Sequence, residues 1–226
     1  HDLLIEKTRD MGASWLCCLV FLHRWCFKEL SSFLLLSRKV EYVDEPTDPK
    51  ALFWKMDFFL KRLPRFLVPN YERFFKRLFN IDLGGTVKGE ATNENAGRGD
   101  RRTAILLDEF AAVENGHEIL AATADASDCR IFNSTPRGTG NAFYQMRQRM
   151  PAEHVRRIHW SSHPIKSRGL YRDANGKFHS PWYDKQFERR GSDAEIAQEL
   201  DIDYLGSNSC FFDSGAHRTM SPCASP

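Results

Sequence analysis

Three things are scarce in this 226-residue sequence: long apolar runs, closely spaced cysteine pairs and net charge. The most apolar stretch, Trp15 to Phe27, is interrupted by His23 and Arg24. A helix that crosses a bilayer needs about 20 apolar residues. The stretch also lacks the basic start and the small-residue cleavage site of a signal peptide. We therefore expect neither a membrane span nor a secretory leader.

The cysteines form no CxxC pair, and the adjacent Cys17 and Cys18 fall in an expected helix, where they cannot easily bridge each other. Disulfides are rare in reducing compartments, and zinc sites usually show cysteines paired at short spacing. We expect reduced, buried thiols in a cytosolic protein, and no zinc site. The six cysteines are Cys17, Cys18, Cys26, Cys129, Cys210 and Cys223.

Charge and composition are those of an ordinary globular protein. Lys and Arg number 32 and Asp and Glu 30, so the net charge is +2, and 42% of the residues are hydrophobic. Such a chain is too nearly neutral to be a polycation, so any contact with nucleic acid has to come from local patches. The length suits one medium domain. Because the chain begins at His1 rather than Met, and residues 214–226 lack apolar periodicity, we expect both ends to have been cut.

Apolar runs of strand length alternate with helical segments, which predicts an α/β domain with a largely parallel sheet. One helix is expected to begin at about Trp15. Another is expected over residues 48–63, where Asp48 as N-cap precedes a proline at the first helical position. The glycine-rich residues 80–91 predict a hairpin, and residues 161–181 a surface excursion with a small hairpin around Asn175 and Gly176. The expected strands are residues 3–5, 33–36, 104–107, 130–133 and 155–160, and the further helices are residues 117–125, 141–150 and 193–200.

A possible phosphate-binding loop lies between the first expected strand and the first helix. A standard P-loop reads Gly, four residues, then Gly-Lys-Ser/Thr. When the pattern is counted from position 7, Gly12 falls on its second glycine and Ser14 on the hydroxyl residue that binds magnesium. Lys7 stands in place of the first glycine, and Ala13 stands in place of the lysine. A flexible lysine stem can still reach the phosphates from the opposite lip of the loop, and the helix N-terminus supplies N–H groups. A polar turn before a helix is the alternative on this loop alone.

Two adjacent acids follow the apolar run Ala104 to Leu107. The run predicts a buried strand, so Asp108 and Glu109 emerge at its carboxyl end, where open α/β sheets bind ligands. Asp108 would hold Mg²⁺, directly or through water, because this cation prefers oxygen ligands. Glu109 would orient and deprotonate the attacking water. The alternative is an acidic cap on a helix that follows a core strand.

The residues Asn133-Ser134-Thr135-Pro136 end the next expected strand. Their polar side chains could contact the γ-phosphate or its water and pass the loss of phosphate to neighbouring elements. A strand that simply ends in a Ser/Thr turn and a proline is the alternative.

A basic loop, Gly97-Arg98-Gly99-Asp100-Arg101-Arg102, precedes the two acids. An arginine between two glycines is mobile and exposed, which suits a finger that completes a neighbouring active site. A solvated basic turn is the alternative, and Arg101, Arg102 and Arg137 compete with Arg98 for the role.

As a set, these motifs resemble the ATPase domain of the large subunit of tailed-bacteriophage terminase. That family combines a lysine-first Walker A, an ILLDE-type Walker B, a Gly-Arg-Gly loop about ten residues earlier and an STP motif one strand later. Residues 35–39, 90–93, 133–144 and 195–200 also read like terminase sequence, so the resemblance covers about residues 3–212. It implies an ASCE-type P-loop NTPase with a mostly parallel central sheet between helices.

The resemblance also implies roles for individual residues and the molecules that they would meet. The loop residues Lys7, Thr8, Arg9, Gly12, Ala13 and Ser14 would cradle ATP, with Ser14 and Asp108 on Mg²⁺. Glu109 would be the catalytic carboxylate, Arg98 the finger, and Thr135 the residue that couples hydrolysis to motion. The implied partners are double-stranded DNA, a small terminase subunit, a portal protein and further copies of the chain in a ring, in the host cytoplasm.

The sequence departs from the family at both ends. Six residues precede Lys7, where a strand and an adenine-contacting segment are usual, and no nuclease-like acids follow Phe212. We therefore expect residues 1–160 to be an ATPase core without its first strand, 161–212 a lid or linker, and 213–226 a disordered tail without nuclease activity. The alternatives are another P-loop DNA translocase of helicase type, or an inactive truncated remnant of a terminase.

Basic and aromatic residues interleave between Lys61 and Arg77, where six basic side chains accompany one acid. Basic groups on phosphates and stacked aromatics could grip DNA. The alternative has the aromatic side chains facing the core and the basic ones facing water. A second candidate patch, with the same alternative, comprises Arg147, Arg149, Arg156 and Arg157.

Overall fold

The computed structural model describes residues 1–92, 96–97 and 99–207, and its centre is a mostly parallel sheet with the strand order β3-β4-β5-β2-β6-β7-β1-β8. The strands from β5 to β8 in this order pair in parallel, whereas β3 and β4 form an antiparallel extension at one edge. The predicted fold class is confirmed. The strands are β1 (Leu3–Lys7), β2 (Ser32–Ser37), β3 (Tyr71–Phe74), β4 (Arg77–Asn80), β5 (Thr86–Ala91), β6 (Ala104–Asp108), β7 (Arg130–Ser134) and β8 (Val155–Ile158).

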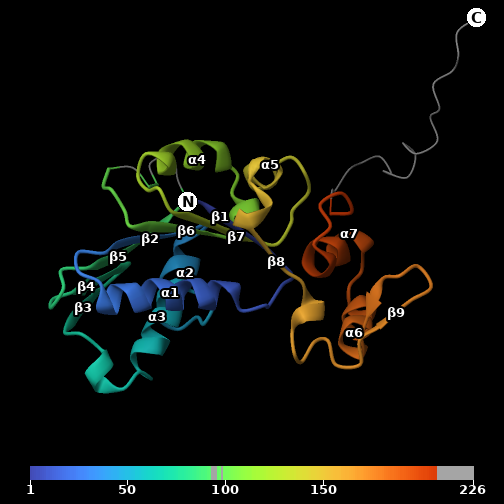
Figure 1. Ribbon diagram of the computed structural model, residues 1–226, viewed down its shortest axis with the longest axis horizontal. Coiled ribbons are helices and arrows are strands. Elements are labelled where there is room, and N and C mark those ends of the chain that lie inside the picture. The colour runs from blue at the N-terminus through green and yellow to red at the C-terminus, as the bar shows by residue number, and fades with distance from the viewer. Residues whose placement is uncertain (93–95, 98, 208–226) are drawn as a thin grey trace, which may run out of the picture.

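Helices cover both faces of the sheet, with α1 and α3 on one face and α4 and α5 on the other (Figure 1). Alternate residues of a strand point to opposite faces. Phe33 and Leu35 of β2 therefore pack in the layer of α1 and α3, and Leu34 and Leu36 pack in the layer of α4 and α5. All four side chains are fully buried, as expected for a central parallel strand. The helices are α1 (Ala13–Phe27), α2 (Val40–Val43), α3 (Leu52–Leu60), α4 (Gly116–Ala124) and α5 (Ala142–Arg149).

Most of the expected elements are confirmed with ends shifted by a residue or two, but the helix over residues 48–63 is shorter than predicted. The Asp48 carboxylate accepts a hydrogen bond from the N–H of Lys50, and the Asp48 carbonyl accepts one from Ala51. These bonds close a turn that keeps Pro49 outside the helix, so α3 begins only at Leu52.

The hairpin expected over residues 80–91 is formed by β4 and β5, with Leu78 opposite Val87. Strand β3 was not predicted from the sequence, and it pairs with β4 through a tight turn at Phe75 and Lys76. Lys76 has a positive φ of 55°, a conformation that residues with a side chain adopt mainly in turns.

Residues 161–207, called the second lobe below, lie beside the end of the sheet where β8 is found (Figure 1). Tyr183, Ile196 and Leu200 pack around Trp160 in an apolar cluster of their own. The small hairpin expected around Asn175 is present as β9 (Tyr171–Arg172) and β10 (Phe178–His179). The lobe continues with α6 (Pro181–Arg189) and α7 (Asp193–Ile196), and the expected helix over residues 193–200 ends as a π-helix, Ala197–Asp201.

No helix in the part of the chain described by the structure is long and apolar enough to cross a membrane.

Candidate active site

A pocket of about 780 Å³ opens at the carboxyl ends of β1, β6 and β7. The three strands are parallel neighbours, so the segments that follow them meet at one edge of the sheet. This edge is where open α/β sheets bind ligands, and the volume suits a small molecule. The pocket is lined by loop residues 9–14, by Asp108 and Glu109 after β6, and by Ser134, Thr135 and Arg137 after β7.

The loop between β1 and α1 turns through two left-handed residues. Asp10 has a φ of 57° and Gly12 a φ of 75°. Gly12 is the N-cap of α1, and its carbonyl accepts the first helical hydrogen bond, from Leu16. Glycine suits this position because it adopts positive φ without steric cost. The first N–H groups of α1 have no partner within the helix and face the same end as the pocket, so they suit an anion.

Lys7 and Glu109 face each other across the pocket. Lys7 is the last residue of β1 and is buried, and its Nζ lies 3.4 Å from Oε1 of Glu109. Glu109 directly follows the buried strand β6 with a positive φ of 53°. Such a backbone conformation costs of order 1–3 kcal/mol and is common at functional sites. The turn leaves the Glu109 side chain 40% exposed in the pocket instead of buried with the strand.

Ser14, Asp108 and Asn133 form a connected polar group at the floor of the pocket. The Ser14 hydroxyl donates to Oδ1 of Asp108 at 2.8 Å, and the Asn133 amide donates to the same oxygen at 2.6 Å and to the Ser14 hydroxyl at 3.2 Å. Asn133 is fully buried, and its Oδ1 has no partner within the described residues. The two residues predicted to hold a metal are therefore within hydrogen-bond distance of each other.

Thr8 and Arg9, predicted to bind the nucleotide, make their contacts within the protein. The Thr8 hydroxyl donates to the Leu200 carbonyl at 2.6 Å and accepts from the Trp160 N–H at 3.1 Å. The Arg9 guanidinium pairs with Glu199 at 3.0 Å, and this hydrogen bond raises the pKa of Arg9. The backbone N–H groups of Thr8 and Arg9 also donate to protein carbonyls. Both residues join the loop to the second lobe, while Ala13 lies buried at the start of α1.

Thr135 and Ser134 connect the end of β7 to the pocket. Thr135 lines the pocket and is largely buried. The Ser134 hydroxyl accepts a hydrogen bond from the N–H of Ala111 at 3.1 Å. Ala111 belongs to a short 3₁₀ helix, Phe110–Ala112, that follows Glu109. The NSTP motif is therefore bonded to the segment that carries the catalytic candidate.

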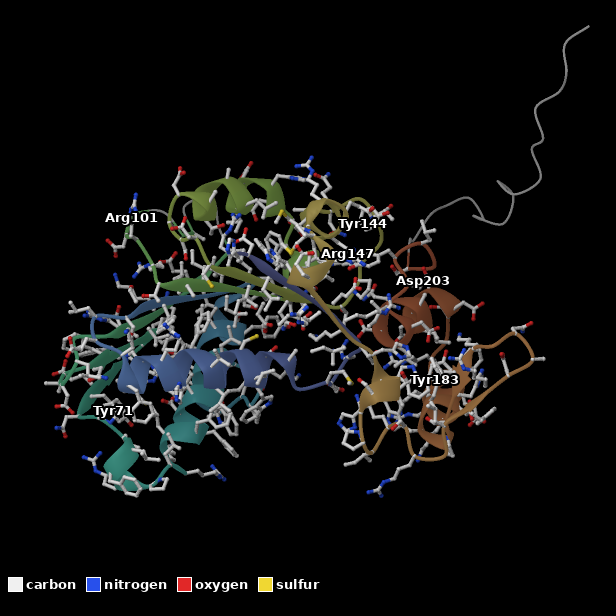
Figure 2. All side chains as sticks on the ribbon, viewed as in Figure 1. Tyr71, Arg101, Tyr144, Arg147, Tyr183 and Asp203 are labelled. Atoms are coloured by element: carbon white, nitrogen blue, oxygen red, sulfur yellow. The ribbon has the colours of Figure 1, made fainter. Side chains whose placement is uncertain are left out.

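The arginines proposed as a finger fall in different places. Arg98 lies outside the described residues. Arg101, on the same loop, lies at the end of the molecule remote from the second lobe (Figure 2), on a separate smaller pocket. The Arg102 guanidinium is buried and bonded to Ser32 and Asp100. Arg137 lines the main pocket.

The sequence does not predict the contacts of two further candidate residues. The NSTP stretch is recognisably polar in sequence, but the contacts of Asn133 with Ser14 and Asp108 depend on the fold. Lys55 of α3 lines the pocket beside Trp15, and its Nζ donates to the carbonyls of Lys50 and Ala51. Burial lowers the pKa of Lys55. A lysine in the apolar sequence of α3 was the one available signal.

In the sheet, β7 lies between β1, whose end carries the loop, and β6, whose end carries the two acids, and this is the fold class of solved terminase ATPase domains. Within this class the chain belongs to one family. Residues 4–212 match the family model "Terminase large subunit, T4likevirus-type, N-terminal". The chain is the ATPase domain of a terminase large subunit, the motor of phage DNA packaging.

Solved structures of phage terminases share this fold. The large terminase ATPase domain of Thermus phage P74-26 is 15% identical, with a TM-score of 0.61 over 90% of this chain and 88% of that one. The HK97 bacteriophage large terminase is 12% identical, with a TM-score of 0.63 over 90% of this chain and 46% of that one. The large terminase of thermophilic bacteriophage D6E in complex with ATP-γ-S is 9% identical, with a TM-score of 0.58 over 90% and 48%.

The chain thus spans about half the length of the HK97 and D6E proteins. No curated protein sequence matches it significantly.

Proposed function

We propose that the pocket at the end of β1, β6 and β7 binds Mg²⁺ and ATP and hydrolyses the γ-phosphate bond to drive double-stranded DNA into a procapsid. The observation that carries the proposal is the 2.8 Å contact between Ser14 of the loop and Asp108 of β6. A hydroxyl at a helix N-terminus and a carboxylate at a strand end, brought together beside a lysine, are the components that a P-loop enzyme needs.

The residues present fit a magnesium ion. Ser14 and Asp108 offer a hydroxyl and a carboxylate, which are oxygen ligands of the kind that Mg²⁺ prefers. In the described part of the chain, no three His, Cys, Asp or Glu side chains gather as a metal cluster, so phosphate oxygens and water would complete the shell. When bound, the ion would neutralise charge on the β- and γ-phosphates. The unpartnered Oδ1 of buried Asn133 could accept a hydrogen bond from a metal-bound water.

Glu109 is the proposed catalytic carboxylate. Its exposed side chain stands in the pocket, where it can orient a water and accept its proton. Lys7 lies close enough to exchange its contact with Glu109 for contact with a phosphate. Because hydrolysis releases the γ-phosphate, Thr135, which also lines the pocket, is the residue proposed to pass this loss to neighbouring elements.

The arginine finger is proposed to act between subunits of a homo-oligomeric ring. Arg101 is not among the residues that line this chain's own main pocket and lies at the end of the molecule remote from the second lobe (Figure 2), so Arg98 or Arg101 would enter the pocket of a neighbour. Arg137 is the alternative from within the same chain.

Basic and aromatic side chains around β3 and β4 are proposed to contact the DNA backbone. The alternative, in which the aromatic residues of this region face the core, does not hold for three of them, because Phe66 is 86%, Phe75 64% and Phe74 50% exposed. Exposed basic residues such as Lys61 and Arg65 accompany them. This surface favours nucleic acid over the alternative of a core-facing aromatic stripe. A small terminase subunit and a portal protein are the further proposed partners, in the host cytoplasm.

Two measurements test the proposal. Lys7→Ala should weaken ATP binding by tenfold or more, because a charged contact to phosphate is worth about 1.5–3 kcal/mol. Exposed Lys28→Ala serves as the matched control. Linear duplex DNA should stimulate hydrolysis more than single-stranded DNA does. Stimulation by single strands alone would favour a helicase-type translocase, and absence of turnover in the parent chain would favour an inactive remnant.

A further inference from the structure

A buried lysine of the second lobe reaches the back of the phosphate-binding loop. The Nζ of Lys166 donates hydrogen bonds to the carbonyls of Arg9 and Asp10, each at 2.8 Å. Lys166 is only 8% exposed, and it is separated from these two residues by more than 150 positions in the sequence.

The surroundings hold this lysine in place. The ammonium group lies 4.7 Å from the centre of the Trp182 ring, and the carbonyl of Lys166 accepts a hydrogen bond from the buried Ser180 hydroxyl at 2.7 Å. A side chain that is fixed at both its backbone and its tip loses little further freedom when it binds the loop.

The geometry of the peptide bond links this contact to the direction of the neighbouring N–H groups. In a trans peptide the C=O and the following N–H point in opposite directions. When Lys166 binds the carbonyls of Arg9 and Asp10 from the side of the second lobe, the N–H groups of Asp10 and Met11 are directed away from that lobe. Asp10 also adopts positive φ, a conformation that needs support from its surroundings.

Two further bonds from the second lobe hold the preceding part of the loop. The Glu199 carbonyl accepts a hydrogen bond from the N–H of Arg9 at 2.8 Å, and the Leu200 carbonyl accepts one from the Thr8 hydroxyl at 2.6 Å. The loop is thus fixed through the hydroxyl of Thr8 and the N–H of Arg9, and also through the carbonyls of Arg9 and Asp10.

We propose that Lys166 is a positioning residue for nucleotide binding, which aims the N–H groups of Asp10 and Met11 at the phosphates and makes phosphate affinity depend on the seating of the second lobe. This inference rests on the proposed assignment of the loop to the phosphates of ATP. The ammonium charge of Lys166 also adds to the positive potential at the loop. Since the contact acts on bound substrate and transition state alike, its loss should raise KM and leave kcat nearly unchanged.

The test compares Lys166→Met with Lys185→Met, which removes an exposed lysine of α6 in the same lobe. We expect Lys166→Met to weaken ADP binding, measured by calorimetry, and to raise the KM for ATP, each by about tenfold or more. The control should match the parent in both. Lys166→Arg, which keeps the charge and several donors, should recover most of the affinity. The unfolding midpoint of the nucleotide-free Lys166→Met protein should stay within a few degrees of the control.

If Lys166→Met binds ADP as tightly as the parent chain does, the inference is overturned. A lower kcat with an unchanged KM would overturn it as well. If the methionine variant does not fold, Lys166→Gln replaces it, and parental affinity in that variant would likewise overturn the inference. Lys7→Ala separates the two proposals. If Lys7→Ala leaves ADP affinity unchanged, the assignment of the loop to the phosphates fails. If Lys7→Ala weakens binding and Lys166→Met does not, only the role of Lys166 fails.

Discussion

Replacing Asn133 by alanine should raise the concentration of Mg²⁺ that half-maximal hydrolysis requires. The Asn133 amide donates to Asp108 at 2.6 Å and to Ser14 at 3.2 Å. Asn133→Ala removes both bonds from a fully buried position. Asp108 is then free to rotate away from the position in which it meets the Ser14 hydroxyl.

The size of the effect follows from the two bonds. A hydrogen bond to a charged group contributes about 1.5–3 kcal/mol, and one to a neutral group about 1 kcal/mol. Water in the pocket can replace part of the loss, since Asp108 is 7% exposed and not sealed. A net cost of about 2 kcal/mol corresponds to roughly 30-fold in the concentration of Mg²⁺ that gives half-maximal activity. This lies within the 10–100-fold range seen when groups that orient metal ligands are removed.

The assay is a Mg²⁺ titration of the ATPase rate at a fixed excess of ATP. Asn175→Ala, on the exposed turn between β9 and β10, is the control and should titrate like the parent. Excess Mg²⁺ should restore most of the rate of Asn133→Ala. A lowered rate at every Mg²⁺ concentration with an unchanged midpoint would refute the reasoning, because Asn133 would then act on the water or phosphate instead of the metal ligands.

Three further outcomes are expected. Glu6 is almost fully buried and accepts hydrogen bonds from Arg147 and Tyr204. Glu6→Gln should therefore lower the free energy of unfolding by about 1–2 kcal/mol and the thermal midpoint by about 5 °C. The control Glu188→Gln, at an exposed position, should keep the stability of the parent. Burial lowers the pKa of His159 to about 4, so the unfolded state takes up the proton first and stability should fall as the pH drops from about 6.5 to 4. Urea titrations of His159→Asn should show a shallower decline, and an equal decline would contradict this cause. Lys61→Ala should weaken duplex binding and reduce the slope of log affinity against log salt by about 1. If the salt dependence of Lys61→Ala matches that of the parent, the DNA does not contact Lys61.

The sequence predicted the core of the site because each motif stands next to a recognisable apolar strand. Ile5, Leu106 and Phe132 lie in runs that can only be buried strands, and parallel strands bring their carboxyl ends to one edge. The pairing of Ser14 with Asp108 was predicted from these strand ends together with the P-loop spacing and the resemblance to terminases. The class of fold followed from the same alternation of strands and helices.

What the sequence could not supply was the direction of individual groups and the long-range contacts. Nothing local distinguishes Thr8, which bonds to the second lobe, from a residue that faces a phosphate. Lys166 sits in a polar stretch with no periodicity, and its two carbonyl partners are defined only once the second lobe has packed on the loop. The exposure of Phe75 could not be decided from the sequence, because Phe75 lies in the β3–β4 turn, which depends on pairing across the sheet edge.

The measurement that tests the central claim most directly is ATP turnover by the chain with Mg²⁺, beside Glu109→Gln in the same buffer. A carboxylate that accepts a proton in the transition state typically contributes 10²–10⁴-fold to the rate, and the amide cannot accept it. We expect Glu109→Gln to bind ATP as tightly as the parent, or tighter because Lys7 is released, while its turnover falls at least about 100-fold. Unchanged turnover in Glu109→Gln would contradict the account.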